Sequence, residues 1–542
     1  MISIRNLLRG AFLLSLIHPS HARAAAQQTD SPTVTLRATT NLVFLDITVL
    51  DKNGHPVVSG LTEDDFTITE DNKPQRIFSF DAPRIDGSRP GENKTHRIGT
   101  ANSTGDTAPA TIFVLDLLNS PYEAFSFIRD SARKYLAAQP AQLLAPTQLM
   151  VLANQSLDMV QGYTRSRADL LSALARVPNK LPFKLSPKWT DERLSQSIEA
   201  LQQIALQNKS VSGKKNIVWL GYGGPSMPMD ASDPRYSKAL RFFAHDTTNM
   251  LVDARMTLFM IYPGLNGAGN PNNIRVGGMN RSSANEDLVA GDPFAGAINF
   301  GLFVNGTGGR LFYDRNDMGA EIDEAQELGS EYYTLTYSPH EEVSDGKFRN
   351  IRVTLRNPNL RAVTRTGYFA PEQLSPKDTR RDAMVDISEA AQSALPFNAL
   401  TLTAADVVRH PDSKTAEVSV ILKSKNINWQ PAENGKSSAD IAFATVALSG
   451  RRDILASKMQ RLTILSNTQD PQLLSKSSNL LSVTIRVPHD TRSVRLVVRT
   501  ADNGQIGTLD LDRKTLDAAP ESPTQNPPLL QRTQSGASTV RQ

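Results

Sequence analysis

Residues 111–120 read TIFVLDLLNS, and this stretch decides the fold expected for the chain. Residues 112–115 are an apolar run of the length expected for a strand that is buried on both faces. The run ends at Asp116, and Ser120, Pro121 and Glu123 follow with the spacing of a helix N-cap, first turn and capping box. The stretch therefore predicts a buried strand that leads through a polar loop into a helix. In open parallel sheets, ligands bind at such carboxyl ends of strands.

Strand-like and helical patterns alternate from this stretch to about residue 330. Strands are expected at 148–153, 217–220, 257–262 and 311–313, and 157–163 is expected to form a hairpin with the first of these. Alternation of this kind requires parallel crossovers, so it predicts an α/β domain with a Rossmann-like, doubly wound sheet over 110–330. The helices are expected at 121–136, 166–177, 191–207, 236–254, 293–304 and 317–328.

The sequence on either side of this domain has strand patterns without helices between them, which predicts flanking antiparallel β domains. The N-terminal unit and the strands after 330 each offer only three or four strands, a marginal number for an independent fold. We therefore hypothesise that these two units pair. The expected organisation is a signal peptide at 1–26, a β unit at 32–83, a linker at 84–109, the α/β domain at 110–330, β strands at 331–371, a connector at 372–395, a β-sandwich at 396–515 and a disordered tail at 516–542.

Composition narrows the class of protein and its location. The chain has 542 residues, a net charge of +4 and no long basic run, which argues against nucleic-acid binding. Arg5 and Arg9 precede the apolar run 11–17 and a small-residue segment, which is the pattern of a secretory signal peptide. No later apolar run is long enough to span a bilayer. We expect a periplasmic or secreted protein that has no transmembrane span once the signal is removed. The absence of cysteine means that packing alone would stabilise it.

The central segment resembles a von Willebrand factor A (VWA) domain, and residues 42–371 resemble the VWFA-related proteins of acidobacteria. The resemblance rests on the segments NLVFLDITVLDKNGHPVVSGLTEDDFTITEDNKPQ, TIFVLDLLNS, NGTGGRLFYDRND, EYYTLTYSP, GKFRNIRVTL and GYFAP. It implies a Rossmann-like sheet flanked by β structure, together with a habit of binding other proteins.

The resemblance also implies a divalent-metal site at the carboxyl edge of the sheet. A domains commonly hold the ion with an Asp-x-Ser-x-Ser loop, a threonine and a second aspartate, which suits Mg²⁺ because it prefers oxygen ligands. Asp116, Ser120 and Thr164 match three of these positions. Leu118 replaces the middle serine, and Gly221 and Tyr222 stand where the second aspartate is expected. The expected site is therefore degenerate, and the alternative is that Asp116 binds loop amides while Ser120 caps its helix.

No pattern in the sequence indicates an enzyme. There is no HExxH segment, no GxSxG elbow, no phosphate-binding loop and no cysteine nucleophile. We expect a non-catalytic, adhesion-like protein at the cell envelope, which holds an unknown protein partner at the edge around Asp116, Ser120, Thr164 and Tyr222. Two alternatives remain at this point: a hydrolase of envelope polymers with an unrecognised carboxylate site, and a purely structural envelope protein.

Overall fold

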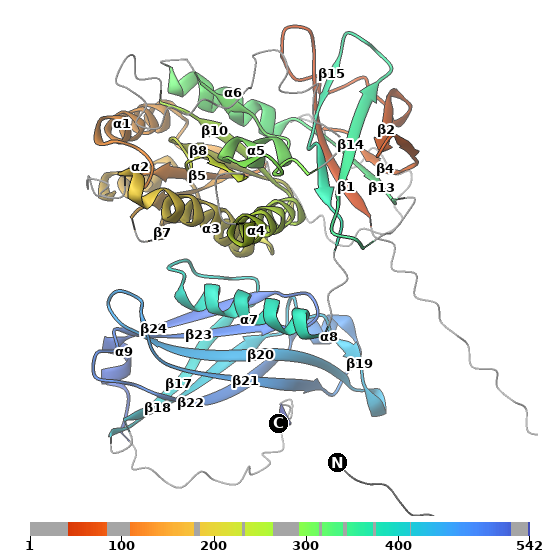
Figure 1. The fold of residues 1–542 in the computed structure, drawn as a ribbon. Helices are drawn as coiled ribbons and strands as arrows, with labels where there is room; N and C mark the ends of the chain where they lie inside the picture. Colours follow the sequence, from red (N-terminus) through yellow and green to blue (C-terminus); the bar gives the residue numbers. More distant parts are fainter. Residues whose placement is uncertain are drawn as a thin grey trace, which may run out of the picture. The chain divides into compact units, whose positions relative to one another are not determined.

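A computed structural model of the chain contains a mainly parallel sheet with its helices and, before and after it in the sequence, strands that form antiparallel sheets (Figure 1). The expected signal peptide, the expected linker and most of the expected disordered tail lie outside the described residues. Among the described residues, no helix is both long and apolar enough to cross a membrane. The structure describes residues 42–83, 109–154, 156–177, 185–229, 234–263, 292–313, 317–339, 344–371, 376–411, 414–521 and 540–541.

The central sheet has six strands in the order β12-β10-β8-β5-β6-β7. All neighbours are parallel except β6 and β7, which form the expected antiparallel hairpin. Strand β5 is buried along its whole length, as its apolar sequence predicts. The strands are β5 (Ala110–Asp116), β6 (Gln142–Leu152), β7 (Leu157–Ser166), β8 (Lys215–Leu220), β10 (Met256–Ile261) and β12 (Leu311–Phe312).

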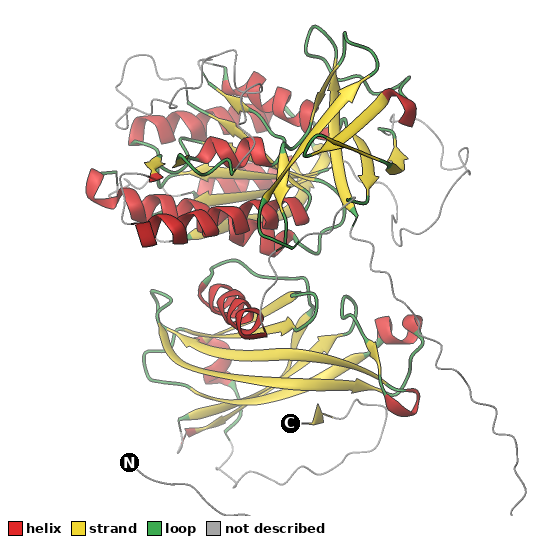
Figure 2. Cartoon of the chain, turned by 45° about the vertical axis from the view of Figure 1, so that its right-hand side comes forward, coloured by secondary structure: helices red, strands yellow, loops and turns green. Residues whose placement is uncertain are grey.

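Helices cover both faces of this sheet (Figures 1 and 2). The apolar core on one face contains side chains of α1, α2 and α6, and the core on the other face contains side chains of α3, α4 and α5. These helices connect successive strands, and a right-handed crossover places each of them on one face or the other. The helices are α1 (Tyr122–Ala138), α2 (Arg167–Arg176), α3 (Thr190–Asn208), α4 (Pro234–Asp253), α5 (Phe300–Gly306) and α6 (Met318–Ser330).

The strands before and after the central domain pair with each other, as the hypothesis of one composite β body requires. Leu45 of β1 faces Leu335 of β13, and Ile68 of β2 faces Val353 of β14. The two resulting four-stranded sheets, β15-β1-β13-β4 and β16-β14-β2-β3, share one apolar core. The strands are β1 (Val43–Leu50), β2 (Phe66–Glu70), β3 (Lys73–Gln75), β4 (Ile77–Asp81), β13 (Tyr333–Tyr337), β14 (Phe348–Leu355), β15 (Arg361–Val363) and β16 (Gly367–Phe369), and the short helix η1 (Glu63–Asp65) precedes β2.

The C-terminal part consists of two antiparallel sheets about a shared core. One sheet has the order β17-β18-β22 and the other β24-β23-β20-β21-β25. Within the β-sandwich expected at 396–515, the sequence predicts strands at 416–422, 441–448, 480–487 and 494–498, which correspond to β18, β20, β22 and β23. It does not predict β17, β21 and β24. The strands are β17 (Leu402–His410), β18 (Thr415–Lys423), β19 (Gln430–Pro431), β20 (Ser437–Leu448), β21 (Ile454–Ser466), β22 (Ser478–Arg486), β23 (Ser493–Thr500), β24 (Ile506–Asp512) and β25 (Val540–Arg541), and the helices are η5 (Glu433–Gly435), α8 (Pro471–Lys476) and α9 (Arg513–Ala518).

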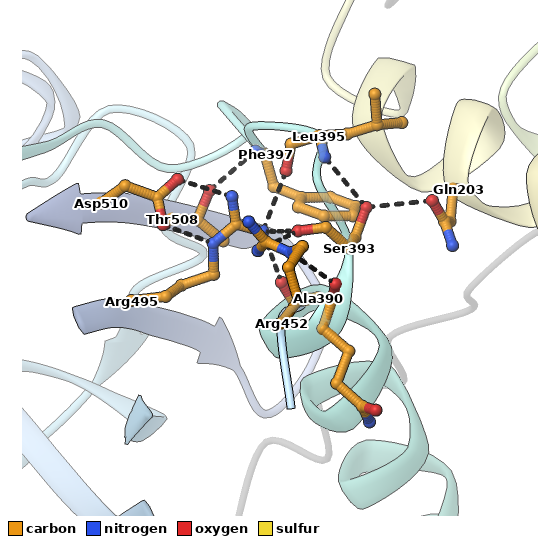
Figure 3. Close-up of polar contacts among 10 residues, drawn as sticks. Gln203, Ala390, Ser393, Leu395, Phe397, Arg452, Arg495, Thr508 and Asp510 are labelled. Atoms are coloured by element: carbon orange, nitrogen blue, oxygen red, sulfur yellow. Dashed lines mark hydrogen bonds and ion pairs between the residues drawn. The ribbon is translucent and has the colours of Figure 1, made fainter. Parts of the chain in front are cut away.

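Helix α7 (Pro376–Gln392) is fastened to this sandwich by a buried arginine (Figure 3). Arg495 on β23 donates Nε and Nη2 to the carboxylate of Asp510 on β24, at 2.7 and 2.5 Å. Its Nη1 donates to the backbone carbonyls of Ala390, Ser393 and Leu395 at the end of α7 and just beyond it. Ala390 lies in the last turn of α7, where backbone carbonyls have no partner within the helix, so this contact fixes the end of the helix against the sheet.

Two local predictions are wrong. Residues 293–304 do not form one helix, because the short strand β11 (Ala297–Ile298) pairs with β9 (Met227–Pro228) before α5 begins. Ser120 does not cap α1, because the N-cap residue is Pro121 and the side chain of Ser120 has no hydrogen-bond partner among the described residues. Ser166, at the start of the helix expected at 166–177, caps α2 by accepting a hydrogen bond from the backbone N–H of Asp169.

Candidate functional site

The carboxyl ends of the parallel strands meet at one edge of the central sheet. Leu115 of β5 is in register with Leu220 of β8, and Leu220 is in register with Ile261 of β10. On the other side, Asp116 is in register with Leu152 of β6. The loops that follow these strands therefore gather around Asp116, which is where a parallel sheet collects its functional groups.

Asp116 is completely buried and accepts hydrogen bonds on both carboxylate oxygens. Its Oδ1 accepts from the backbone N–H of Asn119 at 2.9 Å, and the Asn119 side-chain amide lies 3.1 Å from both oxygens. Its Oδ2 also accepts from Trp219 Nε1 at 3.2 Å and from the backbone N–H of Gly223 at 2.8 Å. A carboxylate offers about four lone-pair positions, so these donors occupy its accepting capacity.

A buried arginine lies behind this carboxylate. Arg193, in the first turn of α3, is 1% exposed and donates Nε to Asn119 Oδ1 at 3.1 Å. Its Nη1 donates to the carbonyl of Leu185 at 3.2 Å, while Nη2 has no partner among the described residues. Asn119 therefore bridges the cation to the anion, since its amide nitrogen faces Asp116 and its oxygen faces Arg193.

Burial dominates the electrostatics of both charges. Burial raises the pKa of Asp116 to about 6, against the hydrogen bonds from Asn119, Trp219 and Gly223, which favour the ionised form. Burial likewise lowers the pKa of Arg193, and the negative charge of Asp116 acts in the opposite direction. The carboxylate and the guanidinium thus stabilise each other in a low-dielectric site.

The loop after β8 closes directly over Asp116, and it needs glycine to do so. Gly221 has φ +146°, and a Cβ built on it would lie 2.5 Å from the Cβ of Asp116 and 3.0 Å from Ser120 Oγ. Gly223 has φ +66°, and a Cβ there would lie 2.7 Å from side-chain atoms of Met260 and Phe300. The glycines at the position expected for a second aspartate therefore serve close approach of the backbone.

The residues present do not fit the metal that the resemblance implies. Mg²⁺ needs about six oxygen ligands, and those of Asp116 already accept hydrogen bonds from the protein. Leu118 is buried in the apolar core and carries no side-chain oxygen. Ser120 Oγ is buried without a partner, but it is a single atom. Among the described residues, no group of three or more histidine, aspartate or glutamate side chains is placed to hold an ion.

Thr164 lies at the opposite end of the sheet, so its assignment to the metal site is wrong. It is in register with Thr147 of β6, and Thr147 is in register with Thr111 near the start of β5. Thr147 and Leu152 are separated by five residues, which is roughly 16 Å along a strand. Thr164 Oγ1 instead accepts from the backbone N–H of Ser166 at 3.0 Å, just before α2.

Sequence reasoning placed only Tyr222 of a set of four tyrosines at this edge, which we call the tyrosine rim. A tyrosine comes within two residues of the end of β8, β10 and β12, and another opens α1 after the loop from β5. The rings of Tyr222 and Tyr262 pack edge to face with centroids 5.5 Å apart. Two of the side chains are well exposed, at 39% and 48% for Tyr122 and Tyr313. The signal in the sequence was the recurrence of tyrosine directly after buried strands. The tyrosine rim consists of Tyr122, Tyr222, Tyr262 and Tyr313.

Arg193 was also missed, and no spacing in the sequence identifies it. It belongs to a helix whose neighbouring residues Leu194 and Ile198 are core residues. A single charge in an amphipathic helix is expected on the solvated side. Arg193 comes within hydrogen-bonding distance of Asn119 only through the tertiary fold.

Comparisons with known proteins give likenesses in structure only. No family model and no curated protein matches the chain. Among solved structures, the VWA domain of SpRpn10 is similar to 29% of this chain over 77% of its own length, with 17% identity and a TM-score of 0.18. The human COPII-coat protein Sec24c covers 48% of this chain over 44% of its own, with 10% identity and a TM-score of 0.22. Likenesses of this size do not bear on what the chain binds.

Proposed function

We propose that this chain is an exported, non-catalytic binding protein that holds a protein partner at the tyrosine rim. On this proposal the central domain is of the VWA type, with a Rossmann-like sheet, and the chain belongs with the VWFA-related proteins that its sequence resembles. The observation that carries the proposal is the placement of tyrosines after the ends of successive parallel strands. Tyrosine is enriched at protein interfaces because it offers a large, stiff surface with a polar tip.

The ordered loops that lie under the tyrosine rim support the same function. The loops after β5 and β8 are held by the buried network of Asp116, Asn119 and Gly223. A surface that is already ordered loses little conformational entropy when a partner binds, and this favours affinity. The Tyr222 and Tyr262 rings support each other, so that pair is also ordered before binding.

The experiment is a comparison of partner recovery from envelope extract. The bait is the full chain as wild type, as a Tyr122→Ala/Tyr313→Ala variant, and as a Leu144→Ala variant. Leu144 is a matched control, because it is 77% exposed and lies near the start of β6, away from the carboxyl edge of the same sheet. We expect the rim variant to lose partners that the Leu144→Ala variant retains.

Two outcomes would overturn the proposal. The first is recovery of the same partners by the rim variant, shown to be folded by circular dichroism. The second is turnover of a purified envelope polymer, since bond cleavage would favour a hydrolase. Titration of each recovered partner against purified wild-type and rim-variant protein then separates direct binding from co-purification.

A further inference from the structure

The buried charge of Asp116 requires a counter-charge, because an isolated carboxylate is strongly destabilised inside a protein. In the expected metal site, a divalent ion would supply that charge. Here the accepting positions of the carboxylate are occupied by Asn119, Trp219 and Gly223, and Thr164 lies elsewhere in the sheet. The positive charge at this edge must therefore come from the chain itself.

Arg193 is linked to Asp116 by hydrogen bonds through the side chain of Asn119. Its Nε donates to Asn119 Oδ1 at 3.1 Å, and the amide nitrogen of the same side chain lies 3.1 Å from both oxygens of Asp116. The Asn119 amide nitrogen also donates to Ser197 Oγ at 2.9 Å, and Ser197 Oγ donates to the carbonyl of Arg193 at 2.8 Å. The bridge between the two charges is therefore held in one orientation from both sides.

We propose that the guanidinium of Arg193 is the resident cation of this edge and makes the site independent of divalent metal. A guanidinium stays charged at every physiological pH and cannot be removed by a chelator. It also opposes the entry of a second cation, because like charges repel strongly where burial lowers the dielectric constant. The edge thus keeps its positive charge permanently, whereas a metal site loses its positive charge when the ion leaves.

Ser120 does not offer a competing site for an ion. Its Oγ is buried without a partner among the described residues, 3.0 Å from the place that a Cβ on Gly221 would occupy. One hydroxyl supplies one ligand, while Mg²⁺ in proteins takes about six oxygens and retains several of them as water. The backbone of the 221–223 loop fills the space next to it.

The first measurement is calorimetric titration of chelator-treated full-length protein with MnCl₂ and MgCl₂. We expect no saturable heat up to millimolar ion and no shift of the melting midpoint. Saturable binding that is lost in Asp116→Asn would overturn the proposal. This measurement needs only wild-type protein for its main outcome, so it stands even if a variant fails to fold.

The second measurement is a double-mutant cycle for thermal stability with Asp116→Asn and Arg193→Met. Each change leaves the other charge buried and unpaired, so each is expected to lower the melting midpoint. The double variant is expected to lose less than the sum of the two shifts, because both charges are removed together. Additive shifts would overturn the proposal. Arg495→Met is the matched control: its guanidinium pairs with Asp510, so its shift should add to that of Asp116→Asn.

Discussion

Two buried arginines, Arg193 and Arg495, are used in opposite ways. Arg495 makes a two-pronged ion pair with Asp510 and donates to the carbonyls at the end of α7, so each guanidinium nitrogen has a partner (Figure 3). Arg193 reaches its carboxylate only through Asn119, and its Nη2 has no partner among the described residues. Arg495 holds α7 against β23, whereas Arg193 supplies a positive charge behind Asp116 at the carboxyl edge.

The two arginines differ in how completely their hydrogen bonds are satisfied. A fully satisfied network rigidifies and specifies a unique packing, as at the junction of α7 and β23. Unsatisfied buried groups are uncommon in folded proteins and call for an explanation. Near the carboxyl edge they include Arg193 Nη2, Ser120 Oγ and Asn154 Oδ1, and further such atoms occur elsewhere among the described residues.

The largest effect is expected for Arg495→Met. The substitution removes the charge and the hydrogen bonds to Asp510, Ala390 and Leu395. Asp510 is half-exposed and can be hydrated, so the cost comes mainly from the buried carbonyls that lose their donor. We expect a loss of about 3 kcal/mol in the free energy of unfolding, since each buried acceptor left unsatisfied costs about 1 kcal/mol or more. Urea denaturation measures it, and hydrogen exchange should show faster opening of α7. A change below about 1 kcal/mol, the scale of an exposed pair, would show that Arg495 does not hold α7 against β23.

The sequence predicted strands and helices well wherever a periodic pattern of apolar residues marks them. The apolar run of β5 and the β6–β7 hairpin could be placed because buried strands and turns have local signals. The pairing of β1 with β13 could be inferred because neither β unit is large enough alone. Strand β21 was missed because its first half is mostly exposed and its apolar residues there do not alternate with polar ones.

The candidate site could be predicted only in part, because it depends on contacts between distant segments. Asp116 was found from its position after a buried strand. Thr164 was misplaced although the expected hairpin implies its position, because the second arm begins at the carboxyl edge and ends at the opposite one. Arg193 lies far along the chain from Asn119, and no local pattern links the two.

The next effect tests whether the loop above Asp116 is as closely packed as the junction at Arg495. Gly221→Ala would place a methyl group 2.5 Å from the Cβ of Asp116 and would strain a backbone with φ +146°. We expect a loss of about 2 kcal/mol, since both overpacking and an unfavourable backbone conformation act. The control is Gly296→Ala, where an added Cβ meets nothing within 4 Å. Equal stability of the two variants would mean that the loop yields easily.

A smaller effect for each pH unit is expected from the titration of Asp116. Burial raises the folded-state pKa of Asp116 to about 6, above the value of about 3.9 for an unfolded aspartate. Between these values the folded state binds a proton that the unfolded state lacks, so stability falls as pH rises from about 4 to about 6. The slope is at most about 1.4 kcal/mol per pH unit. It is measured as the difference in unfolding free energy between wild type and Asp116→Asn. A difference that instead grows in favour of wild type over this range would contradict the raised pKa.

The smallest effect is expected for Ser120→Ala, which tests whether the Ser120 side chain caps α1. If Ser120 capped α1, its loss would cost about 1 kcal/mol. In the structure its hydroxyl is buried and unpartnered, so alanine removes an unsatisfied polar group, and we expect a change within about 0.5 kcal/mol or a slight gain. Ser166→Ala is the matched control, because Ser166 does accept from the backbone N–H of Asp169 and should show the full cost of a lost cap. A clear loss for Ser120→Ala in chemical denaturation would reveal a partner for this hydroxyl and would weaken the contrast between a satisfied junction and an unsatisfied edge.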